Sequence, residues 1–338
     1  ALDETIAALP KDLRAKVAAI GVTGQMHGVI LSDKGRLSPL ATWKDARASA
    51  SGKLAGIKGK PGCEKLKDGF GLTTMACLAD EGKLEGWTSA CTIHDLLVQR
   101  ICFLKKPVCD PADAASWGLF DVFKSKWNLE AVHALGIKES LLPKVLKAGA
   151  KAGNLASAQA KKWGVKADIP VVAATGDNQA SILATASAPD TEIYLTIGTG
   201  AQLSVVVETE AAQKLPGSPA MELRPFFDGR LLAVAAPLCG GQAFAWLVKS
   251  LAQAFKDLGV EGPSEDALYK KLDVLSRPAE NSPLTVKPNF LGERHDPSLR
   301  GEIHGIELGN FTLGNLASSL AEGIVLNMRQ MMPDWVFE

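Results

Sequence analysis

The sequence predicts an α/β protein built from two domains. Between residues 169 and 207, apolar runs typical of strands alternate with a helix-like stretch, which favours layered α/β architecture over a bundle or a sandwich. Two of these runs, at 169–174 and 192–197, lead into glycine-centred turns. A length of 338 residues exceeds what one ordinary core supports, so we expect two domains of roughly 150 residues each.

The first part of the chain predicts a helix, a strand and a hairpin. Apolar residues near helical spacing predict a helix over 2–17, and residues 17–24 are typical of a buried strand that ends in a glycine-bounded turn. Residues 29–37 predict a hairpin with its turn at Asp33-Lys-Gly35. The glycine- and lysine-rich segment 50–70 is expected to form a surface loop.

The middle of the chain, from 91 to 165, has a mainly helical pattern. Within it, 92–102 places the apolar positions 93, 96, 97 and 101 on one helix face. The elements expected next are a strand over 169–174, a helix over 178–187 and strands over 192–197 and 203–207. We expect the domain boundary near Ala188-Pro-Asp190, which gives an N-terminal domain of 1–188 and a C-terminal domain of 189–338.

Composition narrows the class of protein and its partners. The 37 basic and 37 acidic residues balance, which gives no support for nucleic acid or an acidic membrane as a partner. The uncharged stretch 231–248 approaches the length of a membrane span, but Pro237, Gly240 and Gly241 interrupt it, so strand, turn and helix are expected there.

The cysteines and histidines predict no disulfide framework and no metal site. The six cysteines form no CxxC pair, and buried free thiols of a cytoplasmic protein are expected. The five histidines show no ligand spacing with one another or with cysteine, so no structural zinc is predicted. The first twenty residues mix charged with apolar residues as an amphipathic helix would, so we expect no signal peptide there.

Two motifs could together transfer a phosphoryl group. In Thr175-Gly-Asp-Asn-Gln, Asp177 stands at a strand end, where it could accept a proton from a substrate hydroxyl or simply cap the following helix. In Ile197-Gly-Thr-Gly, the backbone of Gly198, Thr199 and Gly200 could approach an anion or simply form a tight hairpin turn. A base and a phosphate cradle are the parts of a kinase, although neither a Walker A pattern nor a G-x-G-x-x-G before a helix occurs.

Two further motifs suit a polyol. Gln25, Met26 and His27 lie between Gly24 and Gly28, and side chains that both donate and accept hydrogen bonds bind sugar hydroxyls well. A lone histidine also often has a purely structural role.

Trp43 and Asp45, in Trp43-Lys-Asp-Ala-Arg47, add an aromatic face and a carboxylate. The alternative for this motif is a surface strand with a solvated ion pair. The segment 289–306 is dense in glycine and charge, as functional loops often are, but an internal ion pair of Glu293 with Arg294 or Arg300 is the favoured account.

Taken in order, these motifs resemble the FGGY carbohydrate kinases over nearly the whole chain. The pieces that carry the resemblance are Gly24-Gln-Met-His-Gly, Trp43-Lys-Asp-Ala-Arg, Ser116-Trp-Gly-Leu-Phe-Asp, Leu142-Pro, Thr175-Gly-Asp-Asn-Gln, Ile197-Gly-Thr-Gly, Gly292-Glu-Arg and Gly301-Glu-Ile-His-Gly-Ile. Each piece is weak alone, and the ordered set is specific. The resemblance implies a two-domain actin-like ATPase (ribonuclease H-like) fold, with ATP, Mg²⁺ and a sugar as ligands.

The resemblance also implies roles for single residues. Asp177 matches the catalytic base. The positions that match the sugar pocket are Gln25, Met26, His27 and Asn178, with Trp43 and Asp45 as contributors. In the other domain, Gly198, Thr199 and Gly200 match a phosphate loop, and Gly241 matches a turn near the nucleotide.

The expected substrate is a ketose. Gln25-Met-His-Gly-Val-Ile, Cys91-Thr-Ile-His-Asp, Gly292-Glu-Arg-His and 322–332 are most similar to family members that convert sedoheptulose to sedoheptulose 7-phosphate. The alternatives are a kinase of xylulose or another pentulose and, in a different class, a degenerate kinase that binds sugar without catalysis.

The chain departs from the family pattern in two places. No Asp-x-Gly-Thr hairpin and no glycine-rich adenosine loop occur, so we expect a chain and a fold that are incomplete at both termini. These 338 residues alone are expected to be weakly active or inactive, because a missing phosphate loop removes transition-state donors.

Overall fold

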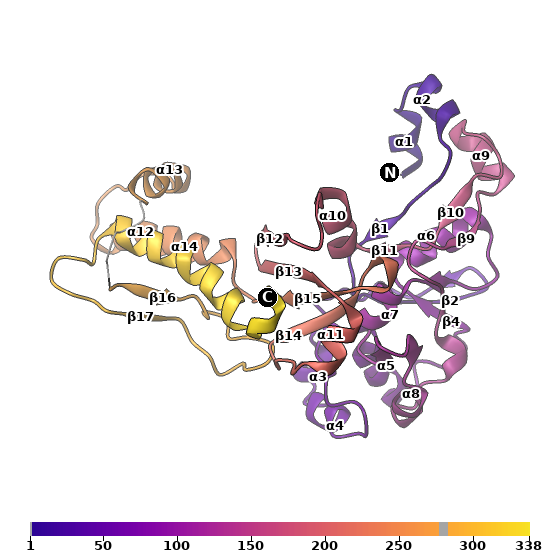
Figure 1. Cartoon of the computed structure of the whole chain (residues 1–338), viewed down its shortest axis with the longest axis horizontal. Coiled ribbons are helices and arrows are strands. Elements are labelled where there is room, and N and C mark those ends of the chain that lie inside the picture. Colours follow the sequence, from indigo (N-terminus) through magenta and orange to yellow (C-terminus); the bar gives the residue numbers. More distant parts are fainter. Residues whose placement is uncertain (1, 277–282) are drawn as a thin grey trace. The chain divides into compact units, whose positions relative to one another are not determined.

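The computed structural model describes residues 2–276 and 283–338, which divide into two compact units (Figure 1). Unit 1 consists of Ala1–Ala186 and Arg224–Leu231, and unit 2 of Ser187–Leu223 and Leu232–Glu338. Both units combine helices with strands, as expected for an α/β protein.

Unit 1 is built from short helices and small sheets. Its helices are α1 (Leu2–Ala7), α2 (Lys11–Lys16), α3 (Arg47–Ala50), α4 (Leu54–Lys58), α5 (Gly71–Asp80), α6 (Ile93–Cys102), α7 (Pro111–Ser116), α8 (Leu129–Ala134), α9 (Ser157–Trp163) and α10 (Asp177–Thr185), with 3-10 turns at Glu139–Leu141 and Phe227–Gly229. Its strands are β1 (Thr23–Gly24), β2 (Ile30–Asp33), β3 (Arg36–Leu37), β4 (Ser89–Cys91), β5 (Val108–Cys109), β6 (Phe120–Asp121), β7 (Lys126–Trp127), β8 (Lys144–Val145), β9 (Lys151–Asn154), β10 (Pro170–Val172) and β11 (Thr175–Gly176).

A parallel pairing between two distant segments of unit 1 positions the candidate site. Ile20 bridges Val171, and β1 pairs with β11 so that Gly24 lies opposite Gly176. Since the two strands run in parallel, the residues after Gly24 and after Gly176 leave the same edge. The strand predicted over 17–24 is therefore only partly formed. It is also only half buried, because Val17, Ile20 and Val22 pack on the core while the residues between them are exposed.

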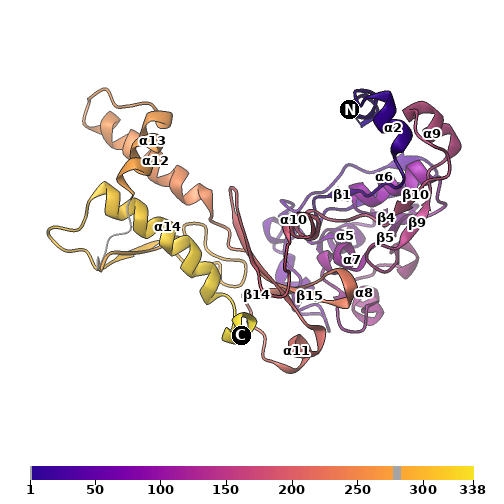
Figure 2. The ribbon, with the colours of Figure 1, turned by 45° about the horizontal axis from the view of Figure 1, so that its top comes forward.

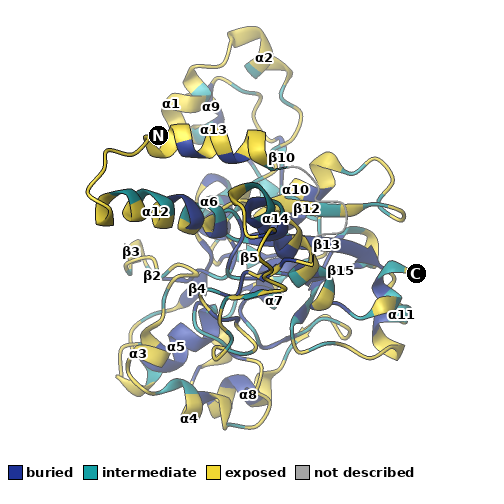
Figure 3. Cartoon of the chain, turned by 90° about the vertical axis from the view of Figure 1, so that its left-hand side faces the viewer, coloured by how far each residue is buried: buried dark blue, intermediate teal, exposed yellow. Residues whose placement is uncertain are grey.

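The larger apolar core of unit 1 surrounds α5, which Figure 3 shows as mostly buried. The prediction of a surface loop over 50–70 is wrong, because this segment contains α4 and contributes side chains to the core. Cys63 and Leu66 are fully buried in that cluster. Cys63 and Leu66 stand singly among glycines and lysines and form no apolar pattern, so their burial could not be predicted from the sequence.

The helix predicted over 2–17 is confirmed only in part, because the structure has two helices, α1 and α2, and Pro10 directly precedes the second. Pro10 adopts an extended conformation with ψ of 143°, and a proline inside a helix removes a hydrogen bond and clashes with the preceding turn. Neither helix buries a residue.

The helical prediction over 91–165 holds only in part, since β5 to β9 are interleaved with α6 to α9. In α6, Ile93 is 42% exposed, whereas the polar His94 and Asp95 are buried. The buried face therefore includes charged residue types, which an apolar pattern assigns to solvent. The hairpin predicted over 29–37 is confirmed by the antiparallel pairing of Asp33 with Arg36.

Unit 2 combines a four-stranded sheet, in the order β12-β13-β15-β14, with helices and a separate hairpin. Its strands are β12 (Ile193–Ile197), β13 (Ala201–Val207), β14 (Met221–Pro225), β15 (Leu231–Ala235), β16 (Thr285–Lys287) and β17 (Glu302–His304). Two of these strands cross the boundary between the units, since Arg224 and Pro225 of β14 and Leu231 of β15 belong to unit 1. Its helices are α11 (Thr209–Lys214), α12 (Gly241–Asp257), α13 (Glu265–Leu275) and α14 (Leu313–Gln330), with a 3-10 turn at Asp334–Phe337. Figure 2 shows that α12, α13 and α14 of this unit lie side by side. The strands predicted over 192–197 and 203–207, and the strand, turn and helix predicted over 231–248, are confirmed.

Helix α14 is packed directly on β16 and also contacts α12, α13 and β13. Helix α14 can lie this close to β16 only because residue 323 is a glycine, since a Cβ atom at Gly323 would lie 1.9 Å from the carbonyl oxygen of Val286. Van der Waals contact at that distance is impossible, so any side chain there would push the helix away from the strand.

All six cysteines are free, and all but Cys102 are buried, which confirms the expected free thiols. In the part of the chain that the structure describes, no helix has both the length and the apolar character needed to cross a membrane.

Candidate active site

Asp177 is the first residue of α10, directly after β11. Its side chain is exposed, and Oδ1 accepts a hydrogen bond from the backbone N–H of Asn178 at 3.0 Å. The capping position of α10 belongs to Gly176, so the capping alternative for Asp177 is wrong. A carboxylate in the first turn of a helix is favoured by the helix dipole, and this one remains accessible to a substrate.

Met26 joins the segment after β1 to the last residue of β11. It is 4% exposed, and a Cβ atom at Gly176 would lie 2.5 Å from its Cγ atom. Only a glycine lets Met26 approach so closely, and the contact places the Gln25–His27 turn beside the residue that precedes Asp177. Gln25 itself is exposed.

His27 is held in an unusual backbone conformation, with a φ of 72°. Its backbone N–H donates to Ser116 Oγ at 3.1 Å, and its Nδ1 lies 2.7 Å from the carbonyl oxygen of Ser116. A carbonyl oxygen only accepts, so Nδ1 carries a proton. The ring is stacked in parallel on Phe70 at a centroid distance of 5.0 Å. Left-handed backbone in a residue other than glycine is uncommon and often marks a functional position.

Trp43 and Asp45 lie in a turn that leads into α3, so the prediction of a surface strand for this motif is wrong. The ion pair that the same alternative predicted is present, between Asp45 and Arg47. Asp45 accepts from Arg47 Nη2 at 2.7 Å, and the carboxylate is 10% exposed. The turn lies near the Gln25–His27 turn, because Val29 bridges Ala41 and the backbone N–H of Gly69, next to Phe70, donates to Asp45 O at 2.8 Å.

Asn178 is buried, and its Oδ1 lies 3.5 Å from Nη1 of Arg224. The neighbouring Gln179 donates from Nε2 to the carbonyl oxygen of Pro225 at 3.3 Å. Sequence reasoning missed Arg224 and Phe70. Phe70 could have been predicted, because the glycines on both sides of it allow other groups to pack closely there. Arg224 could not, because it is 46 residues from its partner Asn178 and stands in no motif.

A buried polar cluster lies behind these strand ends. His94 Nε2 is 2.8 Å from Asp113 Oδ2, and both side chains are almost fully buried. Burial lowers the pKa of His94, and burial together with the charges of Asp110 and Asp177 raises the pKa of Asp113 well above its ordinary value. A Cβ atom at Gly24 would lie 2.5 Å from His94 Nδ1, so the cluster directly supports β1.

In unit 2, Gly198, Thr199 and Gly200 form the turn of the β12–β13 hairpin, as the structural alternative predicted. The turn also rests on the start of α12. Gly241 N donates to Gly198 O at 2.8 Å, and Gly240 N and Gln242 N both donate to Thr199 O at 3.1 Å.

Two N–H groups of this turn remain available. Across the described residues, the backbone N–H groups of Thr199 and Gly200 donate to no acceptor. The hairpin turn and an anion cradle are therefore compatible descriptions of one structure.

A hollow of about 630 Å³ follows α12 beyond Gly241. The residues that line it are Gln242, Ala245, Trp246, Lys249, Ser250 and Gln253. Trp246 is stacked on Phe290 at a centroid distance of 4.3 Å, which fixes an aromatic wall there. Gly241 is the one residue of this region that the sequence motifs predict to bind the nucleotide.

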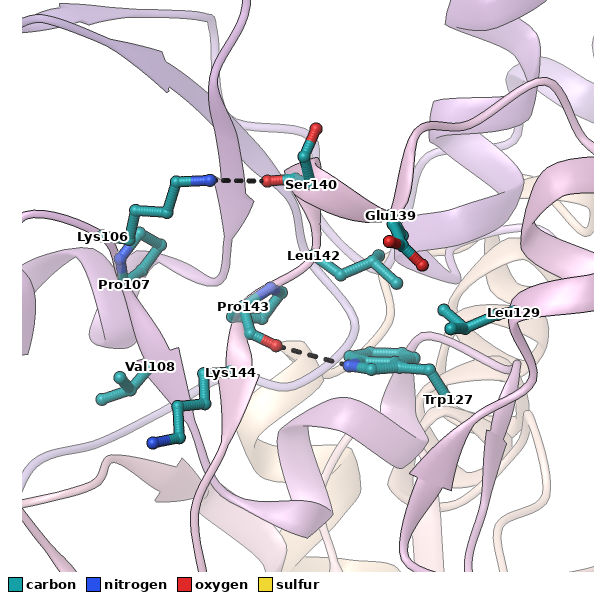
Figure 4. A pocket seen from close by; sticks show the side chains of 10 residues that line it. All are labelled: Lys106, Pro107, Val108, Trp127, Leu129, Glu139, Ser140, Leu142, Pro143 and Lys144. Atoms are coloured by element: carbon teal, nitrogen blue, oxygen red, sulfur yellow. Dashed lines mark hydrogen bonds between the residues drawn. The ribbon is translucent and has the colours of Figure 1, made fainter.

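A second hollow, of about 530 Å³, lies elsewhere in unit 1 between Lys106, Trp127, Leu129 and Lys144 (Figure 4). Lys106 Nζ donates to Ser140 O at 3.0 Å and Trp127 Nε1 to Pro143 O at 3.3 Å, so these polar groups already have partners. None of the predicted site residues lines this hollow, and we exclude it from the candidate site.

The segment 289–306 does not contain the expected ion pair. Glu293 accepts hydrogen bonds from Leu238 N, Asn289 Nδ2 and Asn327 Nδ2, at 3.0 to 3.1 Å. Arg294 donates to Ala236 O, and Arg300 donates to backbone carbonyls of its own loop. Glu293 is therefore hydrogen-bonded by amide N–H groups and not by the arginine guanidinium that the sequence predicted.

The chain is similar in sequence and in fold to several known proteins. Residues 1–184 match the profile of the FGGY family of carbohydrate kinases, N-terminal domain. The chain is 32% identical over 355 residues to a sedoheptulokinase of Homo sapiens, which covers 98% of this chain and 73% of that protein. It is 22% identical over 336 residues to a xylulose kinase of Staphylococcus xylosus, which covers 93% and 65%. A solved structure of ligand-bound xylulose kinase from Lactobacillus acidophilus superposes with a TM-score of 0.76 at 21% identity, covering 98% of this chain and 67% of that one.

Proposed function

Because this chain belongs to the FGGY family of carbohydrate kinases, as its motif order predicts, we propose that it transfers the terminal phosphoryl group of ATP to sedoheptulose and forms sedoheptulose 7-phosphate. Its class, a sugar phosphotransferase with the actin-like ATPase fold, agrees with the sequence prediction. The observation that carries the proposal is the exposed carboxylate of Asp177 at the edge where β1 and β11 end together.

In the proposed reaction, Asp177 is the general base. A sugar hydroxyl oxygen attacks the terminal phosphorus of ATP, its proton passes to the Asp177 carboxylate, and the bond from that phosphorus to the ADP oxygen breaks. Proton acceptance requires a carboxylate that substrate can reach, and the exposure of Asp177 meets this requirement.

The sugar is proposed to lie against the turn after β1. Gln25, His27 and Asn178 offer hydrogen-bonding groups to its hydroxyls, Met26 forms an apolar floor, and Trp43 and Asp45 contribute from the neighbouring turn. The contact of Met26 with Gly176 supports this assignment, because it joins the floor to the base.

The nucleotide phosphates are proposed to bind at the Gly198–Gly200 turn. The available N–H groups of Thr199 and Gly200 would donate to phosphate oxygens, and Gly241 at the start of α12 adds the positive end of a 17-residue helix. We accordingly assign sugar binding and the base to residues 1–188 and nucleotide binding to 189–338.

Magnesium is proposed to enter with ATP. The described residues include no group of three or more His, Cys, Asp or Glu side chains that could hold a metal ion. Mg²⁺ in kinases is held largely by phosphate and water oxygens, so a dedicated protein cage is unnecessary. No step of the proposed reaction depends on a metal ligand of this chain.

We propose a cytoplasmic location, which the free state of all six cysteines supports.

Sedoheptulose is preferred over xylulose because the sedoheptulokinase shares more identity with this chain than the xylulose kinase does. An assay on the full-length enzyme that follows ADP release with each sugar tests the choice. A higher kcat/KM for sedoheptulose is expected, and a clear preference for xylulose would reject it.

Replacement of the base tests the mechanism. In the full-length protein, Asp177→Asn should lower turnover at least about 100-fold, because a general base contributes 10²- to 10⁴-fold. Sugar affinity, measured by calorimetry, should stay near that of the parent. Asp12→Asn, an exposed aspartate on α2, is the matched control and should behave as the parent. Turnover of Asp177→Asn within tenfold of the parent would exclude Asp177 as the base.

A further inference from the structure

Glu293 is a carboxylate in the interior of unit 2 that the proposed reaction does not use. It is 2% exposed. Oε1 accepts from Asn289 Nδ2 at 3.1 Å and from Asn327 Nδ2 at 3.0 Å, and Oε2 accepts from the backbone N–H of Leu238 at 3.1 Å. Burying a carboxylate costs several kcal/mol unless its hydrogen bonds are supplied, and here three donors supply them.

The hydrogen bond to Leu238 connects Glu293 to the loop between β15 and α12. Arg294, the next residue along the chain, donates from Nη1 to Ala236 O at 3.0 Å in the same loop. The Gly292-Glu-Arg motif therefore holds the loop at two points, at Ala236 and at Leu238.

The same loop supports the glycine turn. A Cβ atom at Gly200 would meet Pro237 O at 3.4 Å, so the turn rests on the loop backbone. A Cβ atom at Gly240 would lie 2.3 Å from the carbonyl carbon of Gly200, so loop and turn are in direct contact there as well. The hydrogen bonds from Gly240, Gly241 and Gln242 to the turn complete the connection.

We propose that Glu293 is a positioning residue for the nucleotide phosphates. It fixes the 236–240 loop against the turn, and the loop in turn fixes the directions in which Thr199 and Gly200 present their N–H groups. The inference rests on the proposed function, since it assumes that phosphate binds at this turn. A pre-oriented donor binds an anion better than one that must first be ordered.

The test is Glu293→Gln, which keeps the size of the side chain. A glutamine has one acceptor oxygen, so it cannot accept from Leu238 and from both asparagines. Mg-ADP affinity should fall at least about tenfold, and KM for ATP should rise similarly, because the loop is no longer held at Leu238 and the N–H groups of the turn are no longer oriented before phosphate binds. Sugar affinity should not change. Glu302→Gln, an exposed glutamate on β17, is the control and should match the parent.

A second substitution separates positioning from simple loss of stability. In the double variant Glu293→Gln/Asn327→Asp, the glutamine oxygen can accept from Leu238 while its amide donates to the introduced carboxylate. Most of the ADP affinity should return. Gly240→Ala disturbs the contact between the 236–240 loop and the glycine turn directly, without a change of charge, because the added Cβ atom would collide with Gly200. It should weaken ADP binding and leave sugar affinity unchanged.

The outcomes distinguish the inference from the proposed function. A parent protein that does not bind Mg-ADP would refute both. A parent that binds it, with Glu293→Gln and Gly240→Ala equal to the parent, would refute the positioning role alone. If sugar and ADP affinities fall together in Glu293→Gln and the double variant restores neither, the role of Glu293 is general folding, and the inference is likewise wrong.

Discussion

His27 shows how one side chain can organise the candidate sugar site. Its left-handed backbone costs of order 1 to 3 kcal/mol, and the two hydrogen bonds to Ser116 offset that cost. The same bonds and the stacking on Phe70 leave the ring little freedom. A side chain that is fixed before the substrate arrives loses little entropy on binding, which favours affinity.

Asp95 presents the opposite case, a carboxyl group that the fold accommodates at a cost. It is 1% exposed, and burial, followed by the charge of Asp113, raises its pKa well above the ordinary value of 3.8. A group with a raised pKa holds a proton in the folded state that it loses in the unfolded state. Its contribution to stability is therefore fully present below about pH 3.8 and is lost as the pH rises toward the folded-state pKa.

Asp95→Asn removes this titration and should stabilise the protein increasingly as the pH rises. The difference in unfolding free energy between variant and parent should grow from pH 5 to pH 8, by up to about 1.4 kcal/mol per pH unit. Urea denaturation at the two pH values measures it. Asp12→Asn should show no such growth, and an equal difference at both pH values for Asp95→Asn would contradict the raised pKa.

Helices and strands with strong local signals were predictable, and those that depend on distant contacts were not. In the hairpin of β2 and β3 and in that of β12 and β13, a glycine marks the turn and apolar residues recur along the strands. The break at Pro10 has a local signal too, because proline disrupts a helix at its own position, although the prediction of one helix over 2–17 overlooked it. By contrast, β5 pairs with β8 across more than thirty residues, and strands of two residues have no pattern of their own.

The candidate site divides in the same way. Asp177, Asn178 and the Gln25–His27 turn stand in motifs, so sequence reasoning proposed them. Arg224 and Ser116 lie 46 and 89 residues along the chain from Asn178 and His27, the residues they contact, so only the fold brings them to the site.

The packing of α14 on β16 depends on a single glycine. Helix propensity alone predicts that Gly323→Ala stabilises α14 by about 1 kcal/mol. The contact with Val286 O predicts the reverse, since overpacking a close contact costs typically 1 to 3 kcal/mol. We expect a net loss, measured as a lower melting temperature. Gly56→Ala in α4 is the control, because a Cβ atom there meets nothing within 4 Å and should be neutral or stabilising. A stabilised Gly323→Ala variant would show that α14 can shift freely on β16.

Each unit contains one part of the proposed machinery and its own support for it. The base and sugar residues of unit 1 rest on β1, β11 and the buried pair of His94 and Asp113. The glycine turn of unit 2 rests on α12 and on the loop that Glu293 holds. Since neither support uses residues of the other unit, each ligand should be recognised by one unit in the absence of the other ligand.

Hydrogen exchange measured with one ligand at a time tests this division. Sedoheptulose alone should slow exchange of backbone amides at 25–28 and 176–179, because bound ligand suppresses the local opening that exchange requires. Mg-ADP alone should slow the amides of Thr199 and Gly200, which donate to no protein acceptor among the described residues and exchange freely until phosphate accepts from them. Protection of Thr199 and Gly200 by the sugar alone, with no effect at 176–179, would reverse the assignment. Such a result would also remove the reason for placing the phosphates at this turn, because its free amides would then serve the sugar.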